Sequence, residues 1–187
     1  MNLAGREIVL GVTGGVAAYK AAMLASLLVQ RGAGVTAVLT PAARRFVGAA
    51  TFAALTGRPV AGRMFDASRF PLGAHIELAA RADLVVVAPA TADFLARVAV
   101  GAGDDLLATL LLCAECPVIL APAMNTAMWE KAAVQRNLRQ VEADGLTVVP
   151  PGTGWLSCRR QGAGRMAEPE AIAAIVDEVV ATRPRRG

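Results

Sequence analysis

The chain has 187 residues, which is enough for one substantial hydrophobic core and too few for two, so we expect a single domain. Hydrophobic residues make up 55% of the sequence and aromatic residues only 4%, which predicts tight packing of small side chains and an apolar surplus that a homo-oligomer would bury. The net charge is +4, but the arginines are scattered and no basic stripe alternates with aromatic residues, so nucleic-acid binding is not expected.

Apolar strands alternate with helices along the chain. We expect strands at residues 7–12, 35–39, 84–88, 118–121 and 146–149. We expect helices at residues 17–30, 41–55, 91–101, 104–113, 127–144 and 169–180. Uninterrupted apolar strands in this alternation predict an α/β fold, a doubly wound parallel sheet with helices on both faces in a Rossmann-type three-layer arrangement.

Ligands of such a sheet bind where its strands end. The expected strands end at Thr13, Thr40, Thr91 and residues 122–125, which therefore share one rim. Two longer stretches, residues 65–74 and 150–168, fall outside the alternation of strands and helices. Because long ordered loops in compact domains are usually functional, we expect both to lie over this rim.

Asn125 lies in the segment 122–129, Pro-Ala-Met-Asn-Thr-Ala-Met-Trp, directly after a buried strand. The residues alone leave two roles open. Asn is a favoured helix N-cap, and Met and Trp would then supply the buried helix face. An asparagine among apolar neighbours is also suited to hold a small carboxylate or amide away from water. Asn125 could serve both roles.

The turn at Gly14-Gly15-Val16-Ala17 joins the first strand to a helix, so its backbone amides could meet a phosphate. It is neither GxGxxG nor a Walker A loop, because Lys20 lies one turn into the helix. A mononucleotide such as FMN, with Thr40 or Thr91 as a hydroxyl donor, fits better than a dinucleotide. The alternative is a glycine turn that serves packing alone.

His75 is the only histidine, and it stands where a loop enters a short helix. A lone histidine is more often structural than catalytic, but this one could accept a proton or bind a carboxylate. Cys158 lies in a glycine-rich stretch with three arginines nearby, which favours a reactive thiol. An ordinary exposed cysteine on a surface loop is the competing interpretation.

No apolar run is long enough to span a bilayer and the N-terminus lacks a signal-peptide core, so we expect a cytoplasmic protein without a membrane partner. Three cysteines in a reducing compartment argue against a disulfide framework. Cys113 and Cys116 form a CxxC pair without a second pair or a histidine nearby, so we expect core packing and no metal site. Residues 183–187 are expected to form a disordered tail.

Five motifs together resemble the homo-oligomeric flavin-containing cysteine decarboxylases, in the order of that family and over residues 6–172. They are the segment 14–20 (Gly-Gly-Val-Ala-Ala-Tyr-Lys), the segment 75–78 (His-Ile-Glu-Leu), the segment 88–92 (Ala-Pro-Ala-Thr-Ala), the segment 122–129, and the loop that runs from Cys158 to Gly164-Arg165-Met166. Five matches in register are far more specific than any one of them.

The resemblance implies a flavodoxin-like fold, a trimer or multiple of trimers, FMN bound between subunits, and an active site assembled across the interface. It implies FMN contacts by Gly14, Gly15, Val16, Thr40, Phe46, Thr91, Ala92, Asp93 and Ala123. It implies an essential His75, a substrate carboxylate held by Asn125, and Cys158 as the late proton donor. It also implies substrate contacts by Met128, Arg165 and Met166, with residues 150–168 closing over the substrate.

The implied chemistry begins with oxidation of the thiol-bearing carbon by FMN to a thioaldehyde, which is an electron sink. CO2 then leaves to give an enethiolate, while Asn125 and His75 orient the carboxylate and limit water access. Return of the hydride and a proton from Cys158 gives a saturated aminothiol.

Three kinds of relative remain open. One branch acts on 4'-phospho-N-pantothenoylcysteine in coenzyme A biosynthesis and gives 4'-phosphopantetheine. A second makes a C-terminal enethiol in a ribosomal peptide and needs no such proton donor, and a third is a flavin-binding regulatory subunit that lacks a catalytic residue. Cys158 and the Gly164-Arg165-Met166 ending favour the coenzyme A branch.

Two departures from the family pattern bear on this choice. Arg159 and Arg160 replace the usual Gly-Asp after the cysteine, and their role is open. Extra positive charge there could meet a substrate phosphate or an acidic peptide. The sequence ends at Gly187 without the synthetase domain of many relatives, so a separate phosphopantothenate-cysteine ligase is expected.

Overall fold

The computed structural model describes residues 2–182, so the expected tail at residues 183–187 lies outside the described residues. One parallel sheet has the strand order β2-β1-β3-β4-β5. Its strands are β1 (Glu7–Val12), β2 (Gly34–Leu39), β3 (Leu84–Ala90), β4 (Val118–Pro122) and β5 (Thr147–Val148). The expected doubly wound, flavodoxin-like α/β fold is confirmed.

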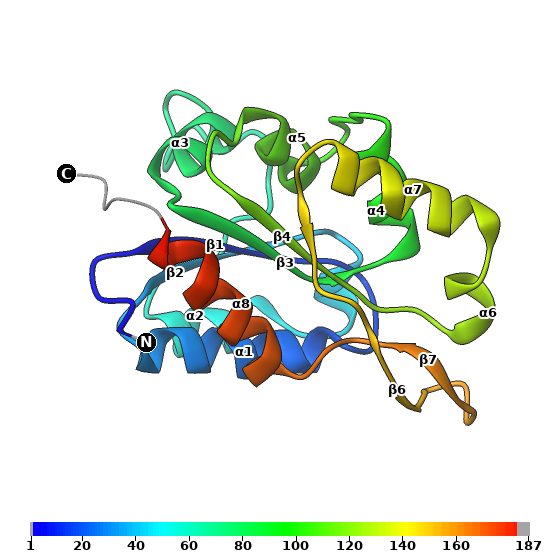
Figure 1. Ribbon diagram of the computed structural model, residues 1–187. Coiled ribbons are helices and arrows are strands. Elements are labelled where there is room, and N and C mark those ends of the chain that lie inside the picture. Colours follow the sequence, from blue (N-terminus) through cyan, green and yellow to red (C-terminus); the bar gives the residue numbers. More distant parts are fainter. Residues whose placement is uncertain (1, 183–187) are drawn as a thin grey trace.

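Helices cover both faces of the sheet (Figure 1). One face carries α1 (Ala18–Gln30), α2 (Ala49–Thr56) and α8 (Pro169–Ala181), and the other carries α3 (Ala74–Arg81), α4 (Ala92–Ala99), α5 (Leu106–Cys113) and α7 (Ala132–Ala143). Each face has its own apolar core, and strand residues alternate between the two. Ile8 and Leu10 pack on the side of α1, whereas Val9 packs on the side of α5.

Two expected helices are interrupted. The helix expected at residues 41–55 is a short 3-10 turn (Ala43–Arg45) followed by α2, because Gly48 is extended and begins a new helix. The helix expected at residues 127–144 is divided into α6 (Thr126–Trp129) and α7, because Lys131 is extended between them. The side chain of Gln135 donates to the carbonyl oxygen of Trp129 at 2.7 Å and satisfies the end of α6.

The stretch expected to be a loop at residues 150–168 contains a β-hairpin. Its strands are β6 (Gly152–Trp155) and β7 (Gln161–Arg165), which pair antiparallel and stand away from the sheet at the lower right of Figure 1. We call residues 152–165 the hairpin below. It leads directly into α8, which lies beside α1.

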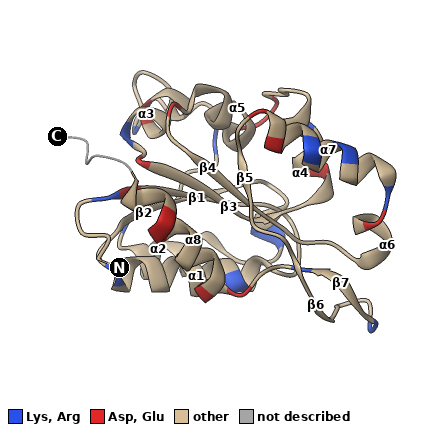
Figure 2. Ribbon diagram, in the orientation of Figure 1, with Lys and Arg blue, Asp and Glu red and all other residues tan. Residues whose placement is uncertain are grey.

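Charged residues of both signs are interspersed along the ribbon (Figure 2). Two ion pairs join α1 to the part of the chain that follows the hairpin, Lys20 with Glu168 at 2.8 Å and Arg31 with Asp177 at 2.6 Å. They tie the two ends of the sequence together on one face of the sheet. None of the helices within residues 2–182 has the length and apolar character that a membrane crossing requires.

The strand order places a topological switch point between β1 and β3. The chain leaves β1 toward β2 on one side and leaves β3 toward β4 on the other, so the two connections diverge. Divergence opens a crevice at the carboxyl ends of the strands, which is where ligands bind in open α/β sheets. The turn after β1 and the start of α4 therefore face the same space.

Candidate active site

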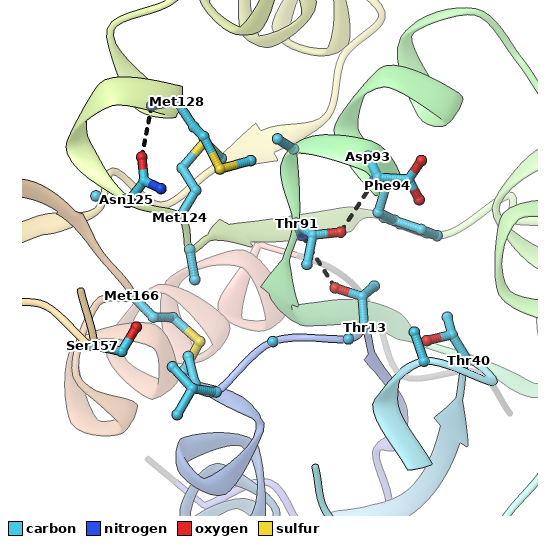
Figure 3. Close-up of a pocket in the computed structure, with 18 of the residues that line it drawn as sticks. Thr13, Thr40, Thr91, Asp93, Phe94, Met124, Asn125, Met128, Ser157 and Met166 are labelled. Carbon is cyan, nitrogen blue, oxygen red and sulfur yellow. Dashed lines mark hydrogen bonds between the residues drawn. The ribbon is translucent and has the colours of Figure 1, made fainter. Parts of the chain in front are cut away.

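Thr13 joins the two strands at the switch point. Its hydroxyl donates to the carbonyl oxygen of Pro89 at 2.7 Å and accepts from the backbone N–H of Thr91 at 3.1 Å (Figure 3). The hydroxyl of Thr91 in turn accepts from the backbone N–H of Phe94 at 3.2 Å and caps α4. Thr13 is 2% exposed, so these bonds are shielded from water.

A cavity of about 1080 Å³ lies directly outside this network. It is bordered by the turn after β1, the ends of β3 and β4, and the hairpin. Most of the site residues expected from the sequence line it, namely Gly14, Gly15, Val16, Thr40, Thr91, Ala92, Asp93, Ala123, Asn125, Met128, Cys158, Arg165 and Met166. Segments far apart in the sequence are thus brought to one site.

The turn after β1 presents backbone donors to the cavity. The N–H groups of Gly15, Val16 and Ala17 have no acceptor within residues 2–182, and all three residues line the cavity. A Cβ at Gly14 would overlap Ala42, whereas a Cβ at Gly15 would meet nothing closer than 3.7 Å. Gly14 is therefore required for packing, while the turn as a whole can receive an anion.

The position of Asn125 is compatible with both roles left open by the sequence, the helix cap and the binding of a carboxylate or amide. Its side-chain oxygen accepts from the backbone N–H of Met128 at 2.9 Å and caps α6 (Figure 3). Its amide Nδ2 donates to no acceptor among the described residues, and Asn125 lines the cavity. The cap thus leaves the amide donor available to a carboxylate. Met124, the residue before Asn125, also lines the cavity.

Strand β7 of the hairpin packs on the Asn125 segment. The backbone N–H of Met124 donates to the carbonyl oxygen of Gly164 at 2.9 Å, and the hydroxyl of Thr126 donates to the carbonyl oxygen of Ala163 at 2.8 Å. Gly164 has a φ of 111°, and a Cβ there would overlap the carbonyl oxygen of Met124. Glycine is required at this position because two backbones meet.

Cys158 lies in the turn of the hairpin, where it is exposed and faces the cavity. The backbone N–H of Arg159 donates to the carbonyl oxygen of Leu156 at 2.9 Å, and the N–H of Leu156 donates to the carbonyl oxygen of Arg160 at 2.8 Å. Arg159 has a φ of 61° and occupies the left-handed position that such three-residue hairpin turns usually give to glycine. The usual glycine after the cysteine thus has a conformational reason.

An arginine held by three carboxylates forms the wall on the side of α4. Arg97 lies 2.9 Å from Asp93, 3.0 Å from Asp104 and 3.4 Å from Asp105. Burial lowers the pKa of Arg97, but the three carboxylates together outweigh burial and the net pKa is raised. The cluster fastens residues 104–105 to α4 and stays charged.

Two residues expected at the site do not line the cavity. Phe46 is 53% exposed after the 3-10 turn, and His75 lies on α3. Residues 65–74, expected over the rim, lead into α3 and do not border the cavity either. In Figure 1, α3 lies at the upper left and the hairpin at the lower right.

His75 nevertheless has an unusual environment. Its Nδ1 is buried and has no hydrogen-bond partner within residues 2–182. The neighbouring side chains of Leu72 and Ile76 are apolar and exposed. A buried polar atom without a partner requires an explanation.

Sequence reasoning missed three residues of the site. The sequence predicts Thr13 only as a strand end, although a hydroxyl beside a glycine turn is a usable signal. Arg97 stands four residues after Asp93, a spacing that favours an ion pair on a helix. The partners of Lys20 are 146 and 148 residues away, so no local signal points to its role.

The fold and the cavity define a flavodoxin-like α/β protein with a large cavity at the β1/β3 switch point. The protein family described as Flavoprotein matches residues 1–182. The chain belongs to this family.

Similar proteins are known in sequence and in structure. The coenzyme A biosynthesis bifunctional protein CoaBC of Vibrio vulnificus is 43% identical over 183 residues, which cover 98% of this chain and 46% of that protein. The chain thus spans less than half the length of this curated relative.

Two solved structures are similar over nearly their whole length. The FMN-dependent cysteine decarboxylase SpaF is 32% identical with a TM-score of 0.83, covering 96% of this chain and 97% of that chain. A cysteine-to-serine mutant of PPC decarboxylase, complexed with pantothenoylaminoethenethiol, is 30% identical with a TM-score of 0.85, covering 92% and 97%.

We predict that Thr13→Val lowers the free energy of unfolding by about 1–3 kcal/mol, because it leaves the Thr91 N–H and the Pro89 carbonyl without this partner. Thr13→Ser keeps the hydroxyl and is the matched control, with a smaller loss. Urea denaturation followed by circular dichroism at one protein concentration measures both. A loss in Thr13→Ser as large as that in Thr13→Val would show that the hydroxyl is not the main contribution of Thr13.

Proposed function

We propose that this chain catalyses the FMN-dependent decarboxylation of 4'-phospho-N-pantothenoylcysteine to 4'-phosphopantetheine, a step of coenzyme A biosynthesis. One observation carries the proposal. A single cavity brings together an amide-lined turn, the free amide of Asn125 and the thiol of Cys158. They would serve as a binding site for an anion, a hydrogen-bond donor to the substrate carboxylate and a proton donor, respectively.

The residues at the switch point fit FMN. The free backbone N–H groups of residues 15–17 suit its phosphate. The hydroxyl of Thr40 accepts from the N–H of Ala43 at 3.2 Å and keeps its own proton for a ligand. Thr91, Ala92, Asp93 and Ala123 line the wall toward β3 and β4, where we place the rest of the cofactor. Phe46 does not line the cavity, so in this proposal it contacts FMN only at the outer edge.

When bound, FMN supplies reversible hydride chemistry at the substrate carbon that carries sulfur. Asn125 holds the carboxylate through Nδ2 and orients it for loss of CO2. Met128 and Met166 surround the substrate with apolar surface and limit access of water, and Arg165 contacts it at the root of the hairpin. Cys158 gives its proton to the carbon that lost CO2, and this lets the saturated thiol form.

His75 acts in the cavity of a second copy in this proposal. His75 does not line the cavity formed by residues 2–182, and its buried Nδ1 has no partner among these residues. Exposed apolar side chains surround it, and others lie at the cavity, including Val16, Tyr19 and Trp155. One contact that buries both surfaces would be heterologous, and a heterologous contact whose rotation closes gives a ring of copies. We propose a trimer, with the hairpin closing over substrate in each of its sites.

The chemistry of the substrate indicates which reaction must precede this one. Its substrate is a cysteine amide of a phosphorylated acid, so a phosphopantothenate-cysteine ligase must supply it. Both reactions use soluble metabolites, and we propose that the protein works in the cytoplasm.

We predict that the purified protein is yellow and converts 4'-phospho-N-pantothenoylcysteine into a product lighter by one CO2, as measured by mass spectrometry. A peptide that ends in cysteine is the control substrate and is expected to stay intact. Turnover of the peptide alone would assign the protein to the peptide-modifying branch. A yellow but inactive protein would indicate a regulatory subunit, and a colourless one that cannot be reconstituted with FMN would refute the proposal.

We predict that Cys158→Ser still releases CO2 but accumulates the enethiol, lighter than the product by two hydrogen atoms, together with reduced flavin. Serine is a much weaker acid than cysteine, so the carbon is not protonated. Cys113→Ser removes another exposed cysteine, one that does not line the cavity, and should turn over fully. Normal product from Cys158→Ser would exclude Cys158 as the proton donor.

We predict that His75→Asn and Asn125→Ser are each inactive but complement one another when co-assembled. Serine at position 125 retains the helix cap. If each site takes its histidine from a neighbour, random assembly restores about one quarter of the sites. Activity per flavin in the mixture measures this fraction. A mixture as inactive as its components would place both residues in one copy's site.

A further inference from the structure

Lys20 is a buried lysine that the proposed chemistry does not use. It lies on α1 one turn after the glycine turn, it borders the cavity, and it is 4% exposed. Lysine is rarely buried unless it is paired. Its Nζ donates to the carbonyl oxygen of Met166 at 3.1 Å and to Oε1 of Glu168 at 2.8 Å.

Both partners follow the hairpin immediately in the chain. Glu168 Oε1 also lies 3.0 Å from Arg165, the last residue of β7. The hydrogen bond from Lys20, with a smaller effect of Arg165, lowers the pKa of Glu168 below its ordinary value near 4.5. Glu168 is therefore charged at neutral pH, and this linkage weakens only in acid, as pH falls below about 4.5.

Within the part of the chain that the structure describes, the hairpin forms hydrogen bonds of its backbone with the rest of the protein through one strand, β7. Strand β7 is bonded to the Asn125 segment through Met124 and Thr126, and its end is bonded to α1 through Lys20. Among residues 2–182, residues 152–155 of β6 form backbone hydrogen bonds only with β7. The position of Cys158 at the tip therefore depends on how firmly β7 and the segment after it are held.

We propose that Lys20 is a positioning residue for Cys158, acting through the end of β7. The inference rests on the proposed function, in which Cys158 delivers a proton after CO2 has left. Proton transfer needs hydrogen-bond distance, and a displacement of about 1 Å can cost two orders of magnitude in rate. Loss of CO2 depends on Asn125, which has its own cap. Loosening the hairpin should thus impair protonation more than decarboxylation.

The test compares Lys20→Met with Arg31→Met in the flavin-loaded protein. Methionine keeps the length and burial of Lys20 but removes the ammonium. Arg31 is the matched control, because it also joins α1 to the chain after the hairpin, through Asp177 and the carbonyl oxygen of Ala173, without touching residues 165–168. Anaerobic single turnovers are quenched and analysed by mass for enethiol and saturated thiol.

We expect the ratio of enethiol to saturated thiol to rise about tenfold or more in Lys20→Met and to stay unchanged in Arg31→Met. Glu168→Gln, at an exposed side chain, should shift the ratio in the same direction by a smaller factor, since an amide oxygen still accepts from Lys20. A merely structural role would lower flavin content or total yield in Lys20→Met and leave the ratio at the wild-type value. That outcome would overturn the proposal.

A second measurement does not depend on turnover. Backbone amide hydrogen exchange of residues 161–165 should be faster in Lys20→Met than in Arg31→Met and the wild type. Equal exchange in all three proteins would overturn the inference even if the decarboxylation is confirmed. If the wild type releases no CO2 from the substrate, the proposed function is refuted. Faster exchange in Lys20→Met than in the wild type would then still support the anchoring role of Lys20.

Discussion

The hydroxyl of Thr13 is the contact on which the site depends. The connections after β1 and β3 diverge at the switch point, where the regular pairing of these two strands ends. Thr13 continues the connection for one more residue, from β1 to Pro89 and Thr91, and thereby sets the glycine turn beside the start of α4. Most of the groups assigned to the cofactor lie at these two ends, and Thr40 and Ala123 lie at the ends of β2 and β4. A cavity that must receive a flat ring and a phosphate at once needs both walls in register. Thr13 joins them through its buried hydroxyl and through its backbone N–H, which donates to the carbonyl oxygen of Pro89 at 3.4 Å.

Close approach of backbones governs the rest of the cavity. Gly14 packs on Ala42, and Gly164 packs on Met124, in both cases without room for a side chain. The second contact has a chemical consequence, because it places the hairpin directly on the segment that carries Asn125. Asn125 and Cys158 therefore lie on neighbouring segments, although they stand 33 positions apart in the sequence. The side chain of Asn125 has two functions, since its oxygen caps α6 and its nitrogen stays available to a ligand.

The parallel sheet could be predicted because its strands are mostly apolar runs bounded by turn residues, whereas the hairpin strands, Gly-Thr-Gly-Trp and Gln-Gly-Ala-Gly-Arg, lack that pattern. The ends of the helices were harder to predict from the sequence. The break at Lys131 depends on contacts of Gln135 and Trp129 that no periodicity reveals. Motifs at strand ends predicted the groups that line the cavity, because topology alone brings such ends together. Lys20 could not be placed, since its role depends on Glu168 at the other end of the chain.

The position of His75 indicates that one copy of the chain does not hold all the expected site residues in its own cavity. Its motif predicted an active-site residue, yet the structure puts it on α3, away from the cavity, with a buried nitrogen that no described residue satisfies. The small-residue composition points the same way, because a core of Ala, Val and Leu leaves apolar side chains such as Phe65 and Leu72 outside. One contact between copies would cover that surface, give Nδ1 a polar environment and bring an imidazole to the cavity. Catalysis would then require assembly, and the apolar surface that drives association would also complete the active site.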